Sequence, residues 1–389
     1  MYLEKFMKGF KQVKAYVEGK GIITTNIGIE NGKIAYIGDD ASKITDALPY
    51  EEGSIVVPGF IDEHIHGAAG ADAMDGTVEA LSTIAKAVAS EGTTGFLATT
   101  MTQSPENISK AMKAVKEYIS ADPEEGAKVL GIHLEGPFIS VKHIGAQPLE
   151  YVAKPEIAVF DDYNEKSGNA IKIVSLAPEV EGADELIKHM TKKGVIASAG
   201  HTDAGYNDMD KAISSGLSNV THTYNAQKGL HHRDVGVVGS GMLFDELNCE
   251  AICDLVHLSA PAIKLLMKNK PHDKFTLITD SMRAKHLPDG LSELGGQEVI
   301  VKDGEARLRN GALAGSILKM NTAIKNLVLK LDVAFTDAID YATINPAKNL
   351  KIDDKVGSIK VGKNADLTVL DCEFNVALTL RAGKEIYSK

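Results

Sequence analysis

Between Pro58 and Leu350 the sequence alternates short apolar runs with amphipathic segments, and this alternation constrains the fold more than any other feature. Eight runs fit strands, and in order they read IVVPGFIDEHIH, TTGFLATT, KVLGIHLEG, IKIVSLAPE, GVIASAGHT, SNVTHTYN, EAICDLVH and KFTLITD. Several are nearly continuous apolar or β-branched stretches, which is typical of parallel strands buried on both faces. Helical patterns fall between many of them, over residues 77–90, 104–120, 181–193 and 203–215. Eight βα units over about 290 residues predict an α/β fold, a (β/α)8 barrel of the TIM type.

A doubly wound open sheet is the structural alternative to this barrel. Such a sheet more often opens with a glycine-rich fingerprint after its first strand. The sequence has no G-x-G-x-x-G motif at that place and no Walker loop, so the barrel is favoured.

The two ends of the chain differ from its middle and resemble each other. In residues 1–57, the dipeptide Asn31-Gly32 separates two apolar runs, which is a strong hairpin signal. Residues 351–389 likewise contain short strand-like runs such as ADLTVLD, separated by glycines and aspartates. We therefore predict one small sheet domain built from residues 1–57 and 351–389, flanking a barrel domain of residues 58–350.

Charge and composition exclude several classes of protein. Lys and Arg total 42 against 53 Asp and Glu, a net charge of −11, which is not the basic footprint of a nucleic-acid binder. The N-terminal stretch MYLEKFMKGFKQVK has no apolar core of a signal peptide, and no run approaches the ~20 apolar residues of a membrane span. Three cysteines without a CxxC pair fit a reducing compartment. We expect a cytoplasmic protein without nucleic-acid or membrane partners.

Polar residues gather at the carboxyl ends of the predicted strands, which form the catalytic face of a barrel. They are His64, His66, Glu135, His201, His222, His257 and Asp280. Residues His64 and His66 share one strand face, so both imidazoles can approach one ion. Each residue alone also fits a structural role, as a hydrogen-bonded histidine or a strand-end carboxylate in a salt bridge. Together they supply imidazole and carboxylate ligands suited to Zn²⁺ or Fe²⁺.

Asp280 ends the eighth run, where an N-cap or a salt-bridge partner is the ordinary interpretation. A metal ion lowers the pKa of a bound water toward ~7. A carboxylate within reach can take the proton from the attacking water and return it to a leaving nitrogen. Conditional on the metal, Asp280 is therefore predicted to be catalytic.

A second polar cluster follows the sixth strand, with Asn225-Ala226 and then His231-His232-Arg233. On a chain of charge −11, the three histidines His231, His232 and His257 together with Arg233 suggest capture of an anion. Arg can bind phosphate through two hydrogen bonds. A solvated loop is the alternative. The segment GALAGS (311–316) could offer backbone N–H groups to a ligand, and an ordinary turn with an N-cap is the alternative. His133, two residues before Glu135, is left outside the ligand set.

The motifs that carry this chemistry resemble a known family. They are PGFIDEHIHG, GIHLEGPFIS, SAGHTDA, THTYNA, LITDSMRAK and GSIKVGKNADLTVLD, and they are similar to the amidohydrolase superfamily along nearly the whole chain. More narrowly, HLEGPF, AGHTDA and THTYNA resemble its N-acetylglucosamine-6-phosphate deacetylase branch. The resemblance implies a barrel with a small β-sandwich, a homodimer, and metal-dependent removal of the N-acetyl group from a phosphorylated amino sugar, with acetate as the second product.

The resemblance also assigns roles to residues. It implies Glu135, His201 and His222 as principal metal ligands, His64 and His66 at a second metal position, and Asp280 as the proton shuttle. It implies one or two divalent ions, Zn²⁺ or Fe²⁺ first, with Mn²⁺, Co²⁺ or Ni²⁺ as alternatives. Substrate contacts are implied for Ala146, Gln147, Asn225, Ala226, Arg233, His257, Leu313, Ala314, Gly315 and Ser316.

Two of these substrate contacts carry a further expectation. Arg233 is a candidate to reach the phosphate bound by the neighbouring subunit. Gln147 stands where some members have histidine, and it can donate a hydrogen bond but cannot become cationic.

Two alternative functions stay open at this point. One is another amidohydrolase acting on cyclic amides or imides; such enzymes commonly bridge two metals with a carboxylated lysine on strand four, but Lys172 lies at the start of that run. The other is a catalytically inactive oligomeric scaffold. Such scaffolds usually lose ligands, and none of the metal and catalytic residues proposed above is missing.

Overall fold

Eight parallel strands form the central sheet of residues 7–389, the part of the chain that the computed structural model describes. In sheet order they are β6 (Phe60–Ile65), β9 (Thr93–Thr100), β10 (Lys128–Glu135), β11 (Ile171–Leu176), β12 (Ile196–Ala199), β13 (Leu217–Val220), β14 (Asn248–Ile252) and β15 (Phe275–Ile278). β15 lies in contact with β6, and the amide of Asp280 donates to the carbonyl of His64 at 2.8 Å. The predicted (β/α)8 barrel is confirmed.

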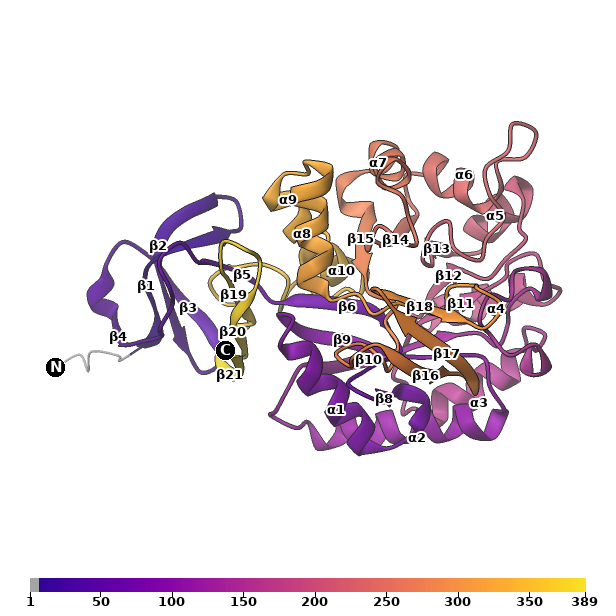
Figure 1. Cartoon of the computed structure of the whole chain (residues 1–389), viewed down its shortest axis with the longest axis horizontal. Coiled ribbons are helices and arrows are strands. Elements are labelled where there is room, and N and C mark those ends of the chain that lie inside the picture. Colours follow the sequence, from indigo (N-terminus) through magenta and orange to yellow (C-terminus); the bar gives the residue numbers. More distant parts are fainter. Residues whose placement is uncertain (1–6) are drawn as a thin grey trace.

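The outer layer of the barrel consists of helices that follow the strands (Figure 1). They are α1 (Val78–Ala89), α2 (Pro105–Ala121), α3 (Ile157–Lys166), α4 (Ala183–Lys192), α5 (Tyr206–Ser214), α6 (Gly236–Leu243), α7 (Ala260–Lys268) and α8 (Met320–Leu331), followed by α9 (Phe335–Asp340) and α10 (Ile344–Asn349). Short 3₁₀ turns cover Ala41–Lys43, Ala73–Asp75, Val141–His143, Leu149–Tyr151 and His272–Lys274. The four predicted helices correspond to α1, α2, α4 and α5. Two of them begin at side-chain caps, since Thr77 and Ser104 accept hydrogen bonds from the amides of Ala80 and Asn107.

The small sheet is built from both ends of the chain, as predicted. Its members are β1 (Met7–Val17), β2 (Gly21–Glu30), β3 (Lys33–Gly38), β4 (Ile44–Ala47), β5 (Ile55–Pro58), β19 (Leu367–Leu370), β20 (Val376–Arg381) and β21 (Lys384–Ser388). β5 joins the two ends because it pairs with β1 on one side and β19 on the other. In Figure 1 this body lies beside the barrel, and it has its own core around Phe10, Ile27 and Leu378. The fold class, a barrel with a small β-sandwich domain from both termini, is confirmed.

The first predicted strand run is divided between the two bodies. Residues Ile55–Pro58 form β5 of the small sheet, and the barrel begins at Phe60. Gly59 joins them where a Cβ atom would lie 2.3 Å from the side chain of Thr94, so only glycine fits. The domain division at 57/58 and 350/351 stays a prediction. The interpretation of the N-terminus as lacking a signal peptide rests partly on residues 1–6, which lie outside the described residues.

A three-stranded antiparallel sheet between β15 and α8 was not anticipated from the sequence. It consists of β16 (Gly290–Leu294), β17 (Gln297–Lys302) and β18 (Glu305–Leu308), and a further short pair is β7 (Gly67–Ala68) with β8 (Ala71–Asp72). The buried face of the three-stranded sheet packs with Met101 and Met282 in a separate core cluster. Leu294, at the end of β16, reaches the pocket described below.

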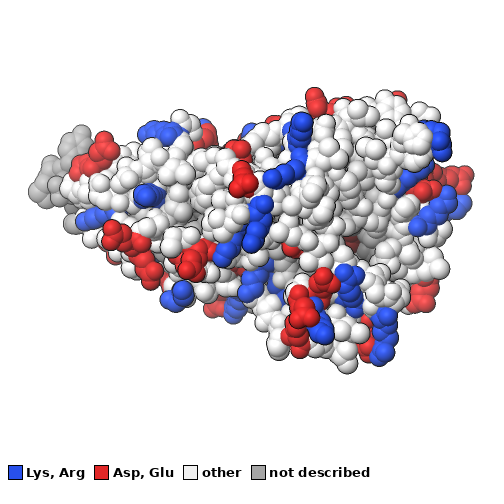
Figure 2. Space-filling model, turned by 45° about the horizontal axis from the view of Figure 1, so that its top comes forward, with Lys and Arg blue, Asp and Glu red and all other residues white. Residues whose placement is uncertain are grey.

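Acidic and basic side chains are interspersed over the face drawn in Figure 2. The net charge of −11 is therefore not gathered into a single patch on that face. Within residues 7–389, no helix combines the length and the apolar character that crossing a lipid bilayer requires.

A buried ion pair ties the segment after β15 to the turn between α1 and β9. The Nζ atom of Lys285 lies 3.0 Å from Oε1 of Glu91, and Nε2 of His286 lies 2.7 Å from the same oxygen. Burial would raise the pKa of Glu91, but Lys285 and His286 outweigh it and lower that pKa. The stabilisation is therefore present at neutral pH and is lost as the pH falls through the lowered pKa.

We expect the substitution Lys285→Met to lower the free energy of unfolding by about 3–5 kcal/mol, because it leaves Glu91 buried without its lysine partner. Urea denaturation followed by circular dichroism measures the change. The control is Lys86→Met, which removes an ion pair with Glu125 whose two side chains are 54% and 76% exposed. That control should cost less than about 1 kcal/mol. Equal losses in the two variants would contradict a stabilising role for the buried pair.

Candidate active site and metal centre

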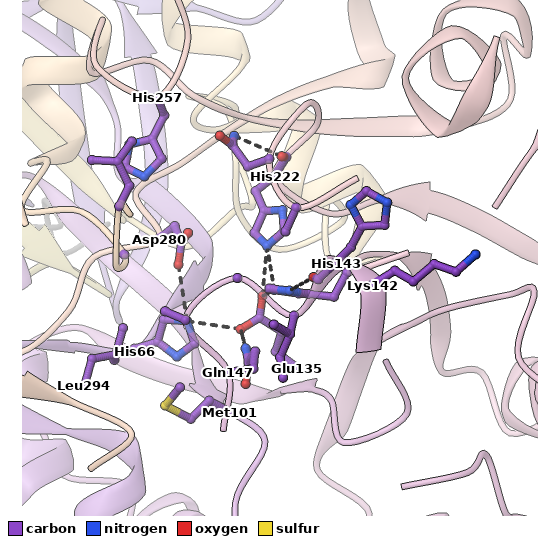
Figure 3. Close-up of a pocket in the computed structure, with 18 residues that line it drawn as sticks. His66, Met101, Glu135, Lys142, His143, Gln147, His222, His257, Asp280 and Leu294 are labelled. Carbon is purple, nitrogen blue, oxygen red and sulfur yellow. Dashed lines mark hydrogen bonds and ion pairs between the residues drawn. The ribbon is translucent and has the colours of Figure 1, made fainter. Parts of the chain in front are cut away.

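A cavity of about 410 Å³ lies at the carboxyl ends of the barrel strands (Figure 3). Its lining includes most of the predicted site residues, namely His66, Glu135, Ala146, Gln147, His201, His222, Asn225, Ala226, His257, Asp280, Leu313 and Gly315. It also includes residues that sequence reasoning did not select, namely Met101, Lys142, His143, Ile144, Gly145 and Leu294. Side chains far apart in the sequence therefore converge on one mouth of the barrel.

Three of the polar residues sit in a backbone conformation that is unusual for non-glycine residues. His201, His222 and Asp280 each come two residues after the end of a strand, with φ angles of 48°, 27° and 48°. Such left-handed residues cost roughly 1–3 kcal/mol each and persist where the surrounding structure holds them. Here the carbonyl of His201 accepts from the Ser140 amide at 2.8 Å, and the Asp280 amide is held by His64. At these three positions the unusual backbone conformation coincides with a polar side chain that lines the cavity, which supports a functional role for them.

The first ligand group consists of Glu135, His201 and His222. Oε1 of Glu135 lies 3.1 Å from Nε2 of His201 and 3.0 Å from Nε2 of His222. The two Nε2 atoms are 3.2 Å apart. All three residues are buried, and their ligand atoms lie within 4.8 Å of one another.

The second ligand group consists of His64, His66 and Asp280. Oδ1 of Asp280 lies 3.4 Å from Nε2 of His64 and 3.2 Å from Nε2 of His66. Glu135 connects the two groups, because its Oε2 lies 3.3 Å from Nε2 of His66. In Figure 3, His66, His222 and Gln147 all point toward Glu135.

The electrostatics of the pocket favour ionised carboxylates. Burial would raise the pKa of Glu135, but His64 and His201 hold that pKa well below its ordinary value. Burial likewise opposes ionisation of Asp280, yet His64 and His66 lower its pKa to about 2. Burial would lower the pKa of His64, whereas Asp280 and Glu135 raise it to about 9. The carboxylates thus favour protonation of His64. A bound cation would supply the same positive charge.

The donor set fits a divalent metal ion. Nδ1 of His64 donates to Oε2 of Glu250 at 3.0 Å, which aims Nε2 into the pocket, and in the neutral ring that metal binding requires this Nε2 carries the lone pair. That Nε2 atom is buried and has no hydrogen-bond partner among the described residues. Nδ1 of His201 donates to the carbonyl of His143 at 3.0 Å, so its Nε2 is an acceptor as well. Acceptor nitrogens and a carboxylate that face one another at such distances repel unless a cation or protons lie between them.

Two buried residues beside the ligand groups clarify which histidines are ligands. Burial, and to a smaller extent the charge of His64, lower the pKa of His133 to about 4, so its ring is neutral at neutral pH. Its Nδ1 donates to the carbonyl of Glu63, and its Nε2 accepts from the hydroxyl of Ser175, so both ring nitrogens are already used. Glu250, which orients His64, was missed in the sequence. A glutamate at the start of the predicted strand EAICDLVH was the signal that could have identified it, because a buried carboxylate needs a partner.

Four predicted site residues do not line this cavity. His64 lies fully buried beneath it. Ala314 is buried in the cluster under the three-stranded sheet, and the Ser316 hydroxyl donates to the carbonyl of Thr279 at 2.6 Å. Arg233 lies in a separate surface hollow with Tyr206 and Lys228. The roles assigned to the predicted site residues stay predictions.

The chain belongs to the amidohydrolase family, whose model matches residues 55–386. It is 41% identical over 377 residues to the N-acetylglucosamine-6-phosphate deacetylase of Bacillus subtilis (strain 168), covering 96% of this chain and 95% of that protein. It is 35% identical over 348 residues to the N-acetylgalactosamine-6-phosphate deacetylase of Escherichia coli O157:H7, covering 90% and 91%. The crystal structure of N-acetylglucosamine-6-phosphate deacetylase from Thermotoga maritima superimposes with a TM-score of 0.88 at 34% identity, covering 98% of this chain and 100% of that one.

Proposed function

We propose that this protein hydrolyses the N-acetyl group of N-acetylglucosamine 6-phosphate and releases glucosamine 6-phosphate and acetate. The observation that carries the proposal is the convergence of Glu135, His201 and His222 on one point, with Asp280 at the same mouth. The names of the relatives above supply the substrate class.

Divalent metal binding follows from this donor set. Glu135, His201 and His222 would hold one ion, and His64 and His66 would help to hold a second, with Zn²⁺ or Fe²⁺ as the proposed metals. When bound, the metal would polarise the acetyl carbonyl and lower the pKa of water.

Asp280 supplies the proton transfer. Its carboxylate lies 3.2 Å from Nε2 of His66 in the second ligand group and lines the cavity, so it is placed to accept the proton of the attacking water. The same carboxyl group then donates that proton to the departing amine nitrogen. Met101 and Leu294 line the cavity beside His66 and give that side of it an apolar surface (Figure 3).

The remaining pocket residues are proposed to bind the sugar phosphate. Nδ1 of His257 donates to Oδ2 of Asp254 at 2.7 Å, which leaves Nε2 free to face a ligand. Asn225 and Ala226 line the same cavity as His257. Such a remote anchor orients the reacting amide.

We also propose a homodimer in which Arg233 serves the neighbouring active site. Arg233 lies in a hollow outside the pocket of its own chain, and that hollow also includes Leu243. Leu230 and Leu243 are 57% and 61% exposed, and the ring of Tyr206 stacks on Phe244 at 5.5 Å. Exposed apolar groups of this kind favour contact with another protein surface. A cytoplasmic location is proposed as well, supported by the free thiols of the three cysteines.

Acetate release from a panel of substrates tests this function. We expect kcat/KM for N-acetylglucosamine 6-phosphate to exceed that for unphosphorylated N-acetylglucosamine by at least about 100-fold, since each hydrogen bond to a charged group contributes about 1.5–3 kcal/mol. A preference for the unphosphorylated sugar would contradict the anchoring role of the pocket.

Two further substrates separate the alternatives. N-acetylgalactosamine 6-phosphate is a second candidate because the Escherichia coli relative is named for it. Turnover of a cyclic imide in place of either sugar would indicate a different amidohydrolase. Inactivity on the whole panel with metal bound would favour the inactive scaffold.

A further inference from the structure

We propose that Gln147 is a positioning residue that orients the Glu135 carboxylate for metal binding, rather than a direct donor to the substrate. The inference rests on the proposed metal site and deepens it.

The side chain of Gln147 is engaged at both ends of its amide. Oε1 accepts from the backbone amide of Thr102 at 2.7 Å, and Nε2 donates to Oε2 of Glu135 at 2.8 Å. The side chain is only 6% exposed. A backbone N–H can only donate, so the oxygen of the amide must face Thr102. The NH₂ group is therefore directed at Glu135, and Figure 3 shows this contact.

With this contact, the two oxygens of Glu135 have different partners. Oε1 faces His201 and His222, while Oε2 is held by Gln147. A carboxylate that is free to rotate would lose this alignment. Hydrogen bonds from outer residues to metal ligands typically change metal affinity by 10–100-fold.

The charge of the donor matters as much as its position. Gln147 is neutral at every pH, so it stabilises the carboxylate without placing positive charge beside the ion.

The segment that carries Gln147 is itself fixed to the site. The amide of Gln147 donates to the carbonyl of Ile144 at 3.0 Å, and the His143 carbonyl accepts from His201. Gln297 of β17 donates to the carbonyl of Ala146 at 2.7 Å. One loop thus positions two of the three ligands in the first group, and Gln297 offers a matched control that holds the loop without contacting Glu135.

The test measures metal affinity directly. Metal-free protein is titrated with Zn²⁺ in competition with a chromophoric chelator, for the wild type and for Gln147→Met, Gln147→His and Gln297→Met. We expect Gln147→Met to weaken Zn²⁺ binding by about 10–100-fold. Gln147→His should restore part of the affinity, because an imidazole N–H can still donate to Oε2 of Glu135. Gln297→Met should bind Zn²⁺ like the wild type.

Thermal unfolding of each metal-free variant separates misfolding from a loss of affinity. If Gln147→Met does not fold, Gln147→Ala decides, because it also removes the donor to Glu135 and should weaken Zn²⁺ binding by about 10–100-fold. Unchanged Zn²⁺ affinity in Gln147→Met together with a raised KM would overturn the proposal and make Gln147 a substrate contact. Wild-type protein that binds Zn²⁺ but releases no acetate from the sugar panel would reject the proposed substrate, and the affinity comparison would still decide the role of Gln147.

Discussion

Replacing Asp280 with asparagine is expected to lower kcat by about 10³-fold, which lies within the range that general acid–base catalysis contributes. Asparagine keeps the shape and one oxygen of the side chain but can neither accept the proton of the attacking water nor return it to the amine. KM should change little, because Asp280 acts on the reacting atoms rather than on the sugar. Acetate release measures kcat, and elemental analysis of the purified variant measures its metal content.

The metal content decides how this result is interpreted. Asp280 lies 3.2 Å from Nε2 of His66, within the second ligand group, so it could also hold metal. A proton shuttle predicts intact metal with lost turnover, whereas a ligand role predicts that metal is lost as well. The control is Asp289→Asn, an exposed aspartate that accepts from the Asp303 amide and should retain wild-type kcat. Full activity of Asp280→Asn would reject the shuttle.

Removal of the divalent ion is expected to have the other large effect. Chelation followed by dialysis should lower activity by about 10³-fold or more, because the metal contributes several kcal/mol of transition-state stabilisation. Adding back Zn²⁺ or Fe²⁺ should restore turnover. The melting temperature should fall with metal removal, since an ion that binds only the folded state stabilises it.

Single-residue variants locate the metal within the cluster of histidines. His222→Ala should lower the metal content, because Nε2 of His222 faces Glu135 and His201. The control is His133→Asn, which keeps a donor and an acceptor for the carbonyl of Glu63 and the hydroxyl of Ser175. Its metal content should match the wild type even if its stability falls. Equal metal loss in the two variants would place His133 among the ligands.

Much of the fold could be predicted because its signals are local. Burial on both faces makes the barrel strands apolar throughout, and the helices with one apolar face, such as α1 and α4, carry a clear period. α6 was missed because its sequence, GVVGSGML, is largely buried and has no polar face to reveal the period. The sheet of β16, β17 and β18 was missed because it is an insertion after the last barrel strand, a place where the barrel pattern predicts only a helix.

The chemistry of the site could be predicted only in part, for a related reason. Strand ends identified Glu135, His201, His222 and Asp280 as neighbours, since parallel strands in a barrel end at one face. The partners that orient these side chains obey no such rule. Glu250 meets His64 across a sequence separation of 186 residues, and this contact exists only because the sheet closes.

The amino-acid sequence thus identifies which groups can take part in the reaction, because the hydrophobic period and the ends of the strands can be recognised from neighbouring residues. How those groups are aimed was decided by the closed barrel and its loops. Hydrogen bonds across the barrel select the ring nitrogen that each histidine presents, and the backbone amide of Thr102 turns Gln147 toward Glu135. Such bonds depend on distances of about 3 Å between segments far apart in sequence, which only the packed structure sets.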